Sequence, residues 1–292
     1  MADPNNTIAF QGAPGANSDM ACRAVYPDME TRPCNAFEDA FEAVTSARAK
    51  YAMIPIDNTL AGRVADVHHL IPEGGLYIIG EHYEPIHHAL LGIKGTKAED
   101  LKYVHSHIHA IPQCRTLIKE RGLISHVHAD TAGAAREISE KNDPQHGAIA
   151  SALAAEIYNL EILENDVQDA DHNTTRFLVL AREPVKLPID SDVMTSIIFQ
   201  TRNIPAALYK ALGGFATNGL SMSKLESYIS AGFKVAQFYC EVEGHPEREN
   251  LRLALEELQF FANEVKILGT YKKHPSRDEK TGKNNCEMGS NT

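Results

Sequence analysis

Residues 171–180 read DHNTTRFLVL, a group of polar side chains followed directly by an apolar run. The run FLVL has the composition of a buried strand. Polar residues ahead of a strand usually form a solvated turn, yet here an acid, a histidine, an amide, two threonines and an arginine stand together. The group is therefore a candidate for more than a turn, and the strand that it precedes ends the first half of the chain.

Short apolar strands alternate with helical patterns throughout residues 7–182. Strands are predicted at TIAF (7–10), YAMI (51–54), LYIIG (76–80) and ALLGI (89–93). Strand and helix in alternation favour an α/β domain with a mostly parallel sheet.

Helices are predicted in the intervening segments. Asn35 and Glu38 resemble a capping box, and the helix that follows carries phenylalanines and a valine on one face. In the segment 147–160, helical spacing relates Ile149, Leu153, Ile157 and Leu160.

The glycine-containing loop QGAPGAN (11–17) leads into another helix. It fits neither the dinucleotide pattern GxGxxG nor the P-loop pattern. One interpretation is a turn in which Asn17 or Ser18 caps the helix. The other is that free N–H groups at the helix start hold a carboxylate.

A second domain follows residues 183–193, which are rich in proline and acids and read as a linker. Residues 194–273 give the order strand, helix, two strands, helix, strand, which is typical of a small ferredoxin-like α+β module. The polar, aperiodic residues 274–292 are expected to be disordered.

Composition excludes several classes of protein. The 292 residues suit two domains, and a net charge of −11 without a basic run disfavours nucleic acid or an anionic membrane as partner. The start MADPNN lacks the pattern of a signal peptide, and no apolar window is long enough to span a bilayer, so neither is expected. The five cysteines are scattered, which predicts reduced thiols in a cytoplasmic protein and no cysteine zinc site.

Two further clusters have open interpretations. In HSHIH, an extended chain would place His105, His107 and His109 on one face, which is the best metal candidate, although a metal site needs further ligands. PIDNTLAG (55–62) follows a strand; its polar cluster is either an Asx turn or a ligand site at the carboxyl end of the strand.

Six motifs in order resemble prephenate dehydratase, which converts prephenate to phenylpyruvate, water and carbon dioxide without a cofactor or a metal. The likeness extends over residues 7–273 and rests on PIDNT, SHIHAIPQC, DTAGAA, GAIAS with AAEIYNL, NTTRF and KLES. The N-terminal family motif matches only in part, because Ala16 and Asn17 depart from it.

The resemblance implies a catalytic threonine at Thr175, whose hydroxyl donates a hydrogen bond to the departing hydroxide. Arg176 either pairs with a substrate carboxylate or braces the site from behind, and alternation along a strand favours bracing. The substrate-binding residues that it implies are Asn58, Thr59, Ser106, Gln113, Ser18, Thr174 and Arg176.

The resemblance also implies a catalytic domain over residues 7–182, built like a periplasmic binding protein from two lobes. One lobe would hold 7–80 plus 176–182 and the other 81–170, with Thr175 on the crossover between them.

Residues 194–273 resemble an ACT regulatory domain, which in this family binds phenylalanine at a subunit interface. Ala206 and Tyr228 depart from the family motifs there. The phenylalanine site would comprise Pro205, Ala207, Leu208, Glu226 and Ser227.

The sequence therefore predicts a carbon–oxygen lyase of phenylalanine biosynthesis, inhibited by phenylalanine and assembled as a homodimer or homotetramer. Arogenate dehydratase, with the same chemistry on an aminated substrate, is the nearest alternative. A two-lobed sensor of small acids without turnover is an alternative of another class.

Overall fold

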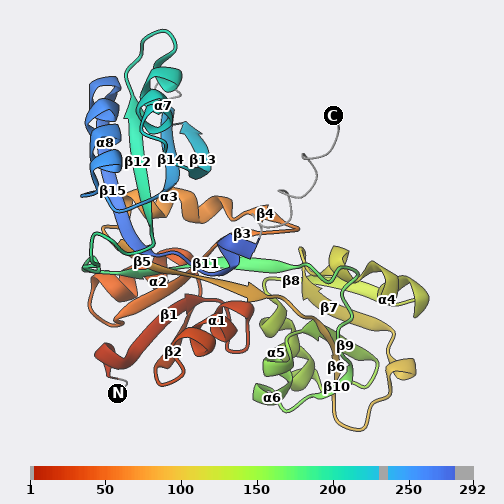
Figure 1. Cartoon of the computed structure of the whole chain (residues 1–292). Coiled ribbons are helices and arrows are strands. Elements are labelled where there is room, and N and C mark those ends of the chain that lie inside the picture. The colour runs from red at the N-terminus through yellow and green to blue at the C-terminus, as the bar shows by residue number, and fades with distance from the viewer. Residues whose placement is uncertain (1–2, 230–235, 280–292) are drawn as a thin grey trace, which may run out of the picture. The chain divides into compact units, whose positions relative to one another are not determined.

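The computed structural model describes residues 3–229 and 236–279 (Figure 1). Contacts divide the chain into two compact units, Met1–Leu70 with His82–Leu178, and Ile71–Glu81 with Val179–Thr292. Within the described residues, no helix has both the length and the apolar composition that crossing a membrane would take.

The first sheet follows the order β2-β1-β3-β11-β5, with β4 paired to β3. Strands β1 and β2 are parallel, as are β1 and β3, and apolar residues of β1 and β3 form its core. Its strands are β1 (Thr7–Gln11), β2 (Glu30–Cys34), β3 (Tyr51–Asn58), β4 (Gly62–Arg63), β5 (Tyr77–Pro85) and β11 (Thr174–Ala181). The helices of this part are η1 (Pro4–Asn6), α1 (Asn17–Val25), α2 (Phe37–Thr45) and α3 (Ala65–Glu73).

The second sheet follows the order β10-β6-β9-β7-β8 and forms the second lobe of the first unit. It is mixed, because β7 is parallel to β8 and β9 while β6 is antiparallel to β9 and β10. Its strands are β6 (Ala89–Gly92), β7 (Tyr103–His107), β8 (Ile124–His128), β9 (His146–Ala150) and β10 (Glu161–Glu164). Its helices are η2 (Ala98–Asp100), η3 (Ile111–Cys114), α4 (Arg115–Glu120), α5 (Thr131–Lys141) and α6 (Ala152–Ile157). The chain thus has the predicted two-lobed α/β fold.

Three predicted helix features are wrong in detail. Helix α1 has Ala16 at its N-cap, so neither Asn17 nor Ser18 caps it. At α2 the cap is Ala36, whose N–H donates to Asp39, one residue along from the predicted box. Ile149 lies in strand β9 and not in a helix, because an apolar strand running into α6 imitates helical spacing by chance.

The loop before α1 packs tightly against α6. Gly15 has φ of +87°, and a Cβ there would lie 2.8 Å from Cα of Ala154. Its carbonyl accepts the Ser151 hydroxyl at 2.6 Å, and the Pro14 carbonyl accepts the Tyr158 hydroxyl at 2.9 Å. The loop therefore joins one lobe to the other through its backbone.

Substituting Gly15 by alanine is expected to destabilise the fold by about 2–4 kcal/mol, because left-handed strain adds to a backbone clash. Gly95→Ala is the matched control, since Gly95 has φ of +83° with nothing within 4 Å of its Cβ position, so only the strain of about 1 kcal/mol applies. Urea unfolding of both variants checks this. Equal losses for the two would show that the contact with Ala154 is unimportant.

The second unit contains the predicted strand–helix–strand–strand–helix–strand module. Its sheet runs β13-β14-β12-β15, all pairs being antiparallel. Apolar residues of the sheet and both helices share one core, including Phe199, Phe215 and Leu258. Its elements are β12 (Val193–Thr201), α7 (Ala207–Thr217), β13 (Met222–Ile229), β14 (Ala236–Glu243), α8 (Glu249–Phe261) and β15 (Ala262–Lys272). This is the α+β ferredoxin-like arrangement expected from the sequence.

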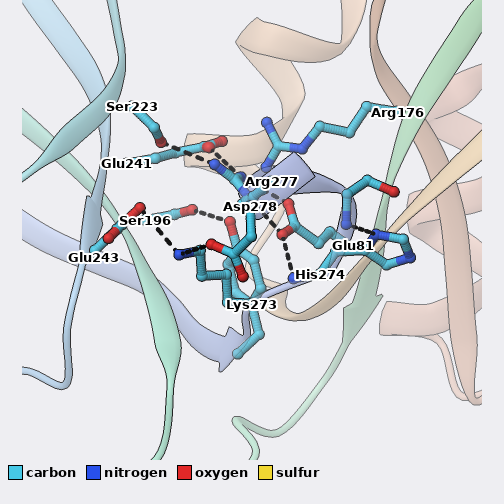
Figure 2. Close-up of polar contacts among 12 residues, drawn as sticks. Glu81, Arg176, Ser196, Ser223, Glu241, Glu243, Lys273, His274, Arg277 and Asp278 are labelled. Carbon is cyan, nitrogen blue, oxygen red and sulfur yellow. Dashed lines mark hydrogen bonds and ion pairs between the residues drawn. The ribbon is translucent and has the colours of Figure 1, made fainter. Parts of the chain in front are cut away.

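The start of the expected disordered tail is ordered. Residues after β15 form α9 (Ser276–Glu279), and Arg277 lies among carboxylates of the second unit (Figure 2). Its guanidinium contacts Glu81 at 2.6 Å and Glu241 at 2.7 Å, and both of these carboxylate side chains are fully buried. The prediction of disorder was therefore wrong for 274–279, because the local composition does not reveal the pairing of Arg277 with distant carboxylates. Residues 280–292 lie outside the described residues.

Candidate functional site

Asn58, the last residue of β3, has a fixed orientation. Its side-chain oxygen accepts the backbone N–H groups of Leu60 at 2.9 Å and Ala61 at 2.8 Å, which is an Asx turn. Its Nδ2 therefore faces β11 and donates to Oδ1 of Asn173 at 2.8 Å and to Oγ1 of Thr175 at 2.9 Å. The Asx turn and the ligand-site interpretations of this segment are thus compatible.

Thr175 lies near the start of β11, where the chain returns from the second lobe to the first sheet. Because its oxygen accepts a hydrogen bond from Asn58, its own proton is directed elsewhere. The side chain lines a cavity. A hydroxyl held in this way is a suitable donor to a ligand oxygen.

Gln113, in η3, receives two hydrogen bonds on one oxygen. Asn173 Nδ2 donates to its Oε1 at 2.7 Å, and Nε2 of His88 lies 3.0 Å from the same atom. Asn173 and His88 are only 3% exposed. Residues far apart in sequence are in this way connected into one network from Asn58 to His88.

The cavity encloses about 200 Å³. An adjoining cavity of about 540 Å³ shares Asn17, Ser18 and Asn58 with it. Residues of both lobes line the first cavity: Asn17, Ser18, Pro55, Asn58, Ala61, Val64, Ile86, His88, His107, His109, Ala110, Gln113, Thr131, Asn173, Thr175 and Phe177. The lining combines apolar walls with several convergent polar groups, as ligand sites do.

Two helices begin at this cavity. Asn17 and Ser18 belong to the first turn of α1, and Thr131 is the first residue of α5. First-turn N–H groups have no acceptor within their own helix, and the helix dipole favours negative charge there. At α5 the Asp130 side chain already accepts the Gly133 N–H at 2.6 Å, so the start of α1 is the end better suited to a ligand carboxylate.

Arg176 points away from the cavity that Thr175 lines. Its guanidinium lies 3.5 Å from Asp57 and 5.9 Å from the ring centroid of Tyr83, and the residue is 7% exposed. The bracing interpretation of Arg176 therefore fits the geometry better than direct contact with a substrate.

Thr59 and Thr174, like Arg176, make structural contacts. The Thr59 hydroxyl donates to the carbonyl of His172 at 2.8 Å and accepts the N–H of Thr174 at 2.9 Å. Neither threonine lines the cavity. These contacts hold the start of β11 against the end of β3, and this fixes the position of Thr175.

Ser106 does not lie where the resemblance predicted. It is fully buried in β7, and its hydroxyl donates to the carbonyl of Ile149 in β9 at 2.7 Å. It is absent from the lining of the cavity. Side chains alternate along β7, so Ser106 and His107 face opposite ways, and His107 is the residue that reaches the cavity.

The histidines of HSHIH have separate environments. His105 is 6% exposed and its Nε2 lies 2.9 Å from Nδ1 of His146, while His107 and His109 line the cavity. Among the side chains that the structure describes, no three from histidine, cysteine or carboxylate residues are arranged to hold a metal ion. The three histidines do not converge on one point.

The buried environment of His105 predicts that the folded protein loses stability in acid. Burial lowers the pKa of His105 to about 4, with Glu137 opposing this and His126, His146 and Lys141 adding to it. Since the unfolded pKa is about 6.5, the unfolded chain binds the proton first, and stability falls as pH drops from about 6.5 to about 4.

We expect this contribution to be on the order of 2 kcal/mol. Urea unfolding at pH 7, 6 and 5 measures the slope, and His105→Gln is expected to reduce it. An unchanged slope in that variant would assign the acid sensitivity to other groups.

Two residues of the network were not predicted. Asn173 stands two residues before Thr175, so the alternation of a strand already placed the two on one side. His88 was visible only as half of a histidine pair. Nothing in the sequence distinguishes it from His87, which is exposed and pairs with Asp166 at 2.8 Å.

Comparison with known proteins assigns the chain to one family. The family profile of prephenate dehydratase matches residues 8–185. The chain is 49% identical over 272 residues to a bifunctional N-acyl-homoserine lactone acylase/prephenate dehydratase of Komagataeibacter europaeus, covering 92% of this chain and 97% of that protein. It is 38% identical to the chloroplastic arogenate dehydratase/prephenate dehydratase 1 of Arabidopsis thaliana, covering 92% of this chain and 72% of that one.

Solved structures give the same grouping. Prephenate dehydratase of Arthrobacter aurescens in complex with L-Phe superposes with a TM-score of 0.84 at 28% identity, covering 91% of this chain and 90% of that one. A structure described as GqqA, a quorum-quenching acylase, gives a TM-score of 0.88 at 49% identity, with 93% and 99% covered. On its fold, its cavity and these relatives, the chain belongs to the prephenate dehydratase family.

Proposed function

We propose that the chain is a prephenate dehydratase that forms phenylpyruvate, water and carbon dioxide for phenylalanine biosynthesis. The observation that carries this is the Thr175 hydroxyl, which accepts a hydrogen bond from Asn58 at 2.9 Å and so has its proton available to the cavity. A hydroxyl donor at a carboxylate-binding cavity is what this elimination requires.

The reaction breaks two bonds. The C4 oxygen of prephenate departs with the electrons of its carbon–oxygen bond, and takes up a proton to become water. The bond from the ring to its carboxylate breaks, carbon dioxide leaves, and that electron pair completes the aromatic ring. Thr175 stabilises the developing hydroxide by hydrogen bonding, while the aromatic product supplies the driving force.

We place one carboxylate of prephenate at Asn17 and Ser18 of α1 and the other near Gln113, because the start of α5 already carries the Asp130 carboxylate. Fixed donors of this kind orient the ring relative to Thr175, and orientation supplies much of an enzyme's acceleration. The ring carboxylate loses its charge in the reaction, so the apolar walls also favour decarboxylation.

Incubation with prephenate tests the proposal, with phenylpyruvate followed by its absorbance in alkali. Arogenate is assayed in parallel, because kcat/KM on the two compounds identifies the preferred substrate. Product formation no faster than the spontaneous reaction, with ligand binding retained, would favour the sensor of small acids. Assays before and after chelation test the metal-dependent alternative.

Phenylalanine inhibition through residues 194–273, as an ACT domain, is part of the proposal. Ala206 at the start of α7 has φ of 57°, so it keeps a backbone shape that favours glycine, the family's residue there. Glu226 in β13 pairs with Lys224 at 3.0 Å and accepts the Tyr228 hydroxyl at 3.1 Å, so Tyr228 takes a polar role beside it.

The Arthrobacter aurescens relative was solved with L-Phe, which supports the same ligand here. Isothermal titration with phenylalanine, repeated in the prephenate assay, measures binding and inhibition together. A chain that turns over prephenate but binds no phenylalanine would limit the proposal to the catalytic part. Light scattering with and without phenylalanine tests for the even-numbered homo-oligomer.

A second candidate activity is hydrolysis of N-acyl-homoserine lactones. It is favoured by one observation, the 49% identity to a protein named for both activities. Water would cleave the amide to give a fatty acid and homoserine lactone. Incubation with an N-acyl-homoserine lactone, with the released amine quantified, tests it, and prephenate as competitor shows whether both activities share a cavity.

A further inference from the structure

His88 lies beside the proposed active site without a role in the reaction described above. It immediately precedes β6, lines the cavity and is 3% exposed. Its backbone N–H donates to Oε1 of Gln168 at 2.8 Å, which fixes the main chain. The buried Nδ1 of its ring has no hydrogen-bond partner within the described part of the chain.

The hydrogen-bond network determines where the proton of His88 sits. Asn58 Oδ1 accepts two backbone N–H groups, so the other end of this amide must donate. Asn173 Oδ1 accepts that bond, so Asn173 Nδ2 must donate to Gln113 Oε1. An oxygen cannot donate, so the contact of 3.0 Å between Gln113 and His88 requires a proton on Nε2.

A neutral histidine protonated on Nε2 has a bare Nδ1. A second proton there would create a buried N–H without an acceptor, which is costly. Burial also lowers the pKa of His88, with the Gln113 bond opposing it and His87 adding to it. Both considerations keep the ring neutral, as a fixed donor toward Gln113.

We propose that His88 is a positioning residue that, as the neutral Nε2–H tautomer, holds Gln113 with its oxygen toward the network and its NH₂ group toward the substrate. Two donors on Gln113 Oε1 oppose a flip of the amide, which would set nitrogen against nitrogen at both contacts. This inference rests on the proposed prephenate turnover, because Gln113 is the group through which His88 acts.

Substitutions of His88 test its role as a donor to Gln113, because glutamine and asparagine place an amide near the former positions of Nε2 and Nδ1 respectively. His88→Leu removes the donor and is expected to raise KM for prephenate about tenfold with a smaller effect on kcat. His88→Gln can present an N–H near the position of Nε2 and is expected to recover most of the loss. His88→Asn reaches only the position of Nδ1 and is expected to recover little.

His87→Leu is the matched control, since His87 is exposed and its partner is Asp166. We expect wild-type kinetics from it. Combining His88→Leu with Gln113→Ala separates indirect from direct action: if His88 acts through Gln113, it adds little to the loss already caused by Gln113→Ala. Additive losses, or equal recovery by glutamine and asparagine, would overturn the proposal.

The tautomer can also be read without activity. In ¹⁵N NMR of imidazole-labelled protein, the His88 signals, identified by their absence in His88→Gln, are expected to show a protonated Nε2 and a bare Nδ1. A protonated Nδ1 would contradict the inference. A wild-type chain that does not turn over prephenate would instead refute the proposed function, while the tautomer would still report on the network.

Discussion

Replacing Thr175 by alanine is expected to lower kcat for prephenate by about 10³-fold, the scale of losing a positioned donor to a developing oxyanion. The fold should persist, because the side chain lines a cavity and its one described hydrogen bond comes from Asn58. Thr175→Ser retains the hydroxyl and is expected to keep much of the rate.

Thr175→Val is the matched variant, since it keeps the shape of threonine and removes only the hydroxyl. Steady-state kinetics with phenylpyruvate as readout, together with melting curves, separate loss of catalysis from loss of fold. Normal turnover by the alanine and valine variants would mean that another group protonates the leaving oxygen.

Replacing Arg277 by methionine is expected to destabilise the second unit by about 3–5 kcal/mol, because it removes a cation that contacts two buried carboxylates. Arg277 contacts Glu81 and Glu241, whose side chains are fully buried, and also donates to the Ser223 hydroxyl at 2.9 Å (Figure 2). A residue near the end of the described chain therefore holds together strands β5, β13 and β14.

Calorimetry of the full chain, which separates the transitions of its units, measures the loss. Arg252→Ala is the control, because its pair with Glu256 is exposed, and such pairs contribute about 0.5 kcal/mol or less. Similar small shifts for both variants would show that the buried carboxylates take up protons instead of requiring Arg277.

The fold was predictable where burial selects apolar residues. The runs in β1, β3, β5 and β6 were each recognised, and so was the module of the second unit. Strands β2, β4, β7, β8, β9 and β10 were not: β9 was assigned to a helix, and of the others β2, β8 and β10 lie at the ends of their sheets. An end strand is solvated along one side, so fewer of its side chains need to be apolar. This is the case for β2 (ETRPC) and β8 (ISHVH).

The site was predictable to the level of residue types. Thr175, Asn58 and Gln113 were expected together, and the structure brings them into one network. The prediction for Ser106 differed from the structure because the sequence gives the alternation of side chains along β7, but not which of the two faces meets the cavity. The role of Asn173 depends on a hydrogen bond across 60 residues, which no local pattern contains.

The Asx turn at Leu60 and Ala61 has a consequence for redesign of the cavity. An aspartate in place of Asn58 would match its volume, yet it would set an oxygen against the oxygen of Asn173 and draw the Thr175 proton toward itself. A substitution of Asn58 is thus tolerated only if the new side chain donates hydrogen bonds toward Asn173 and Thr175, and its size matters less. A search for altered substrate scope should therefore vary the apolar walls and leave the amides unchanged.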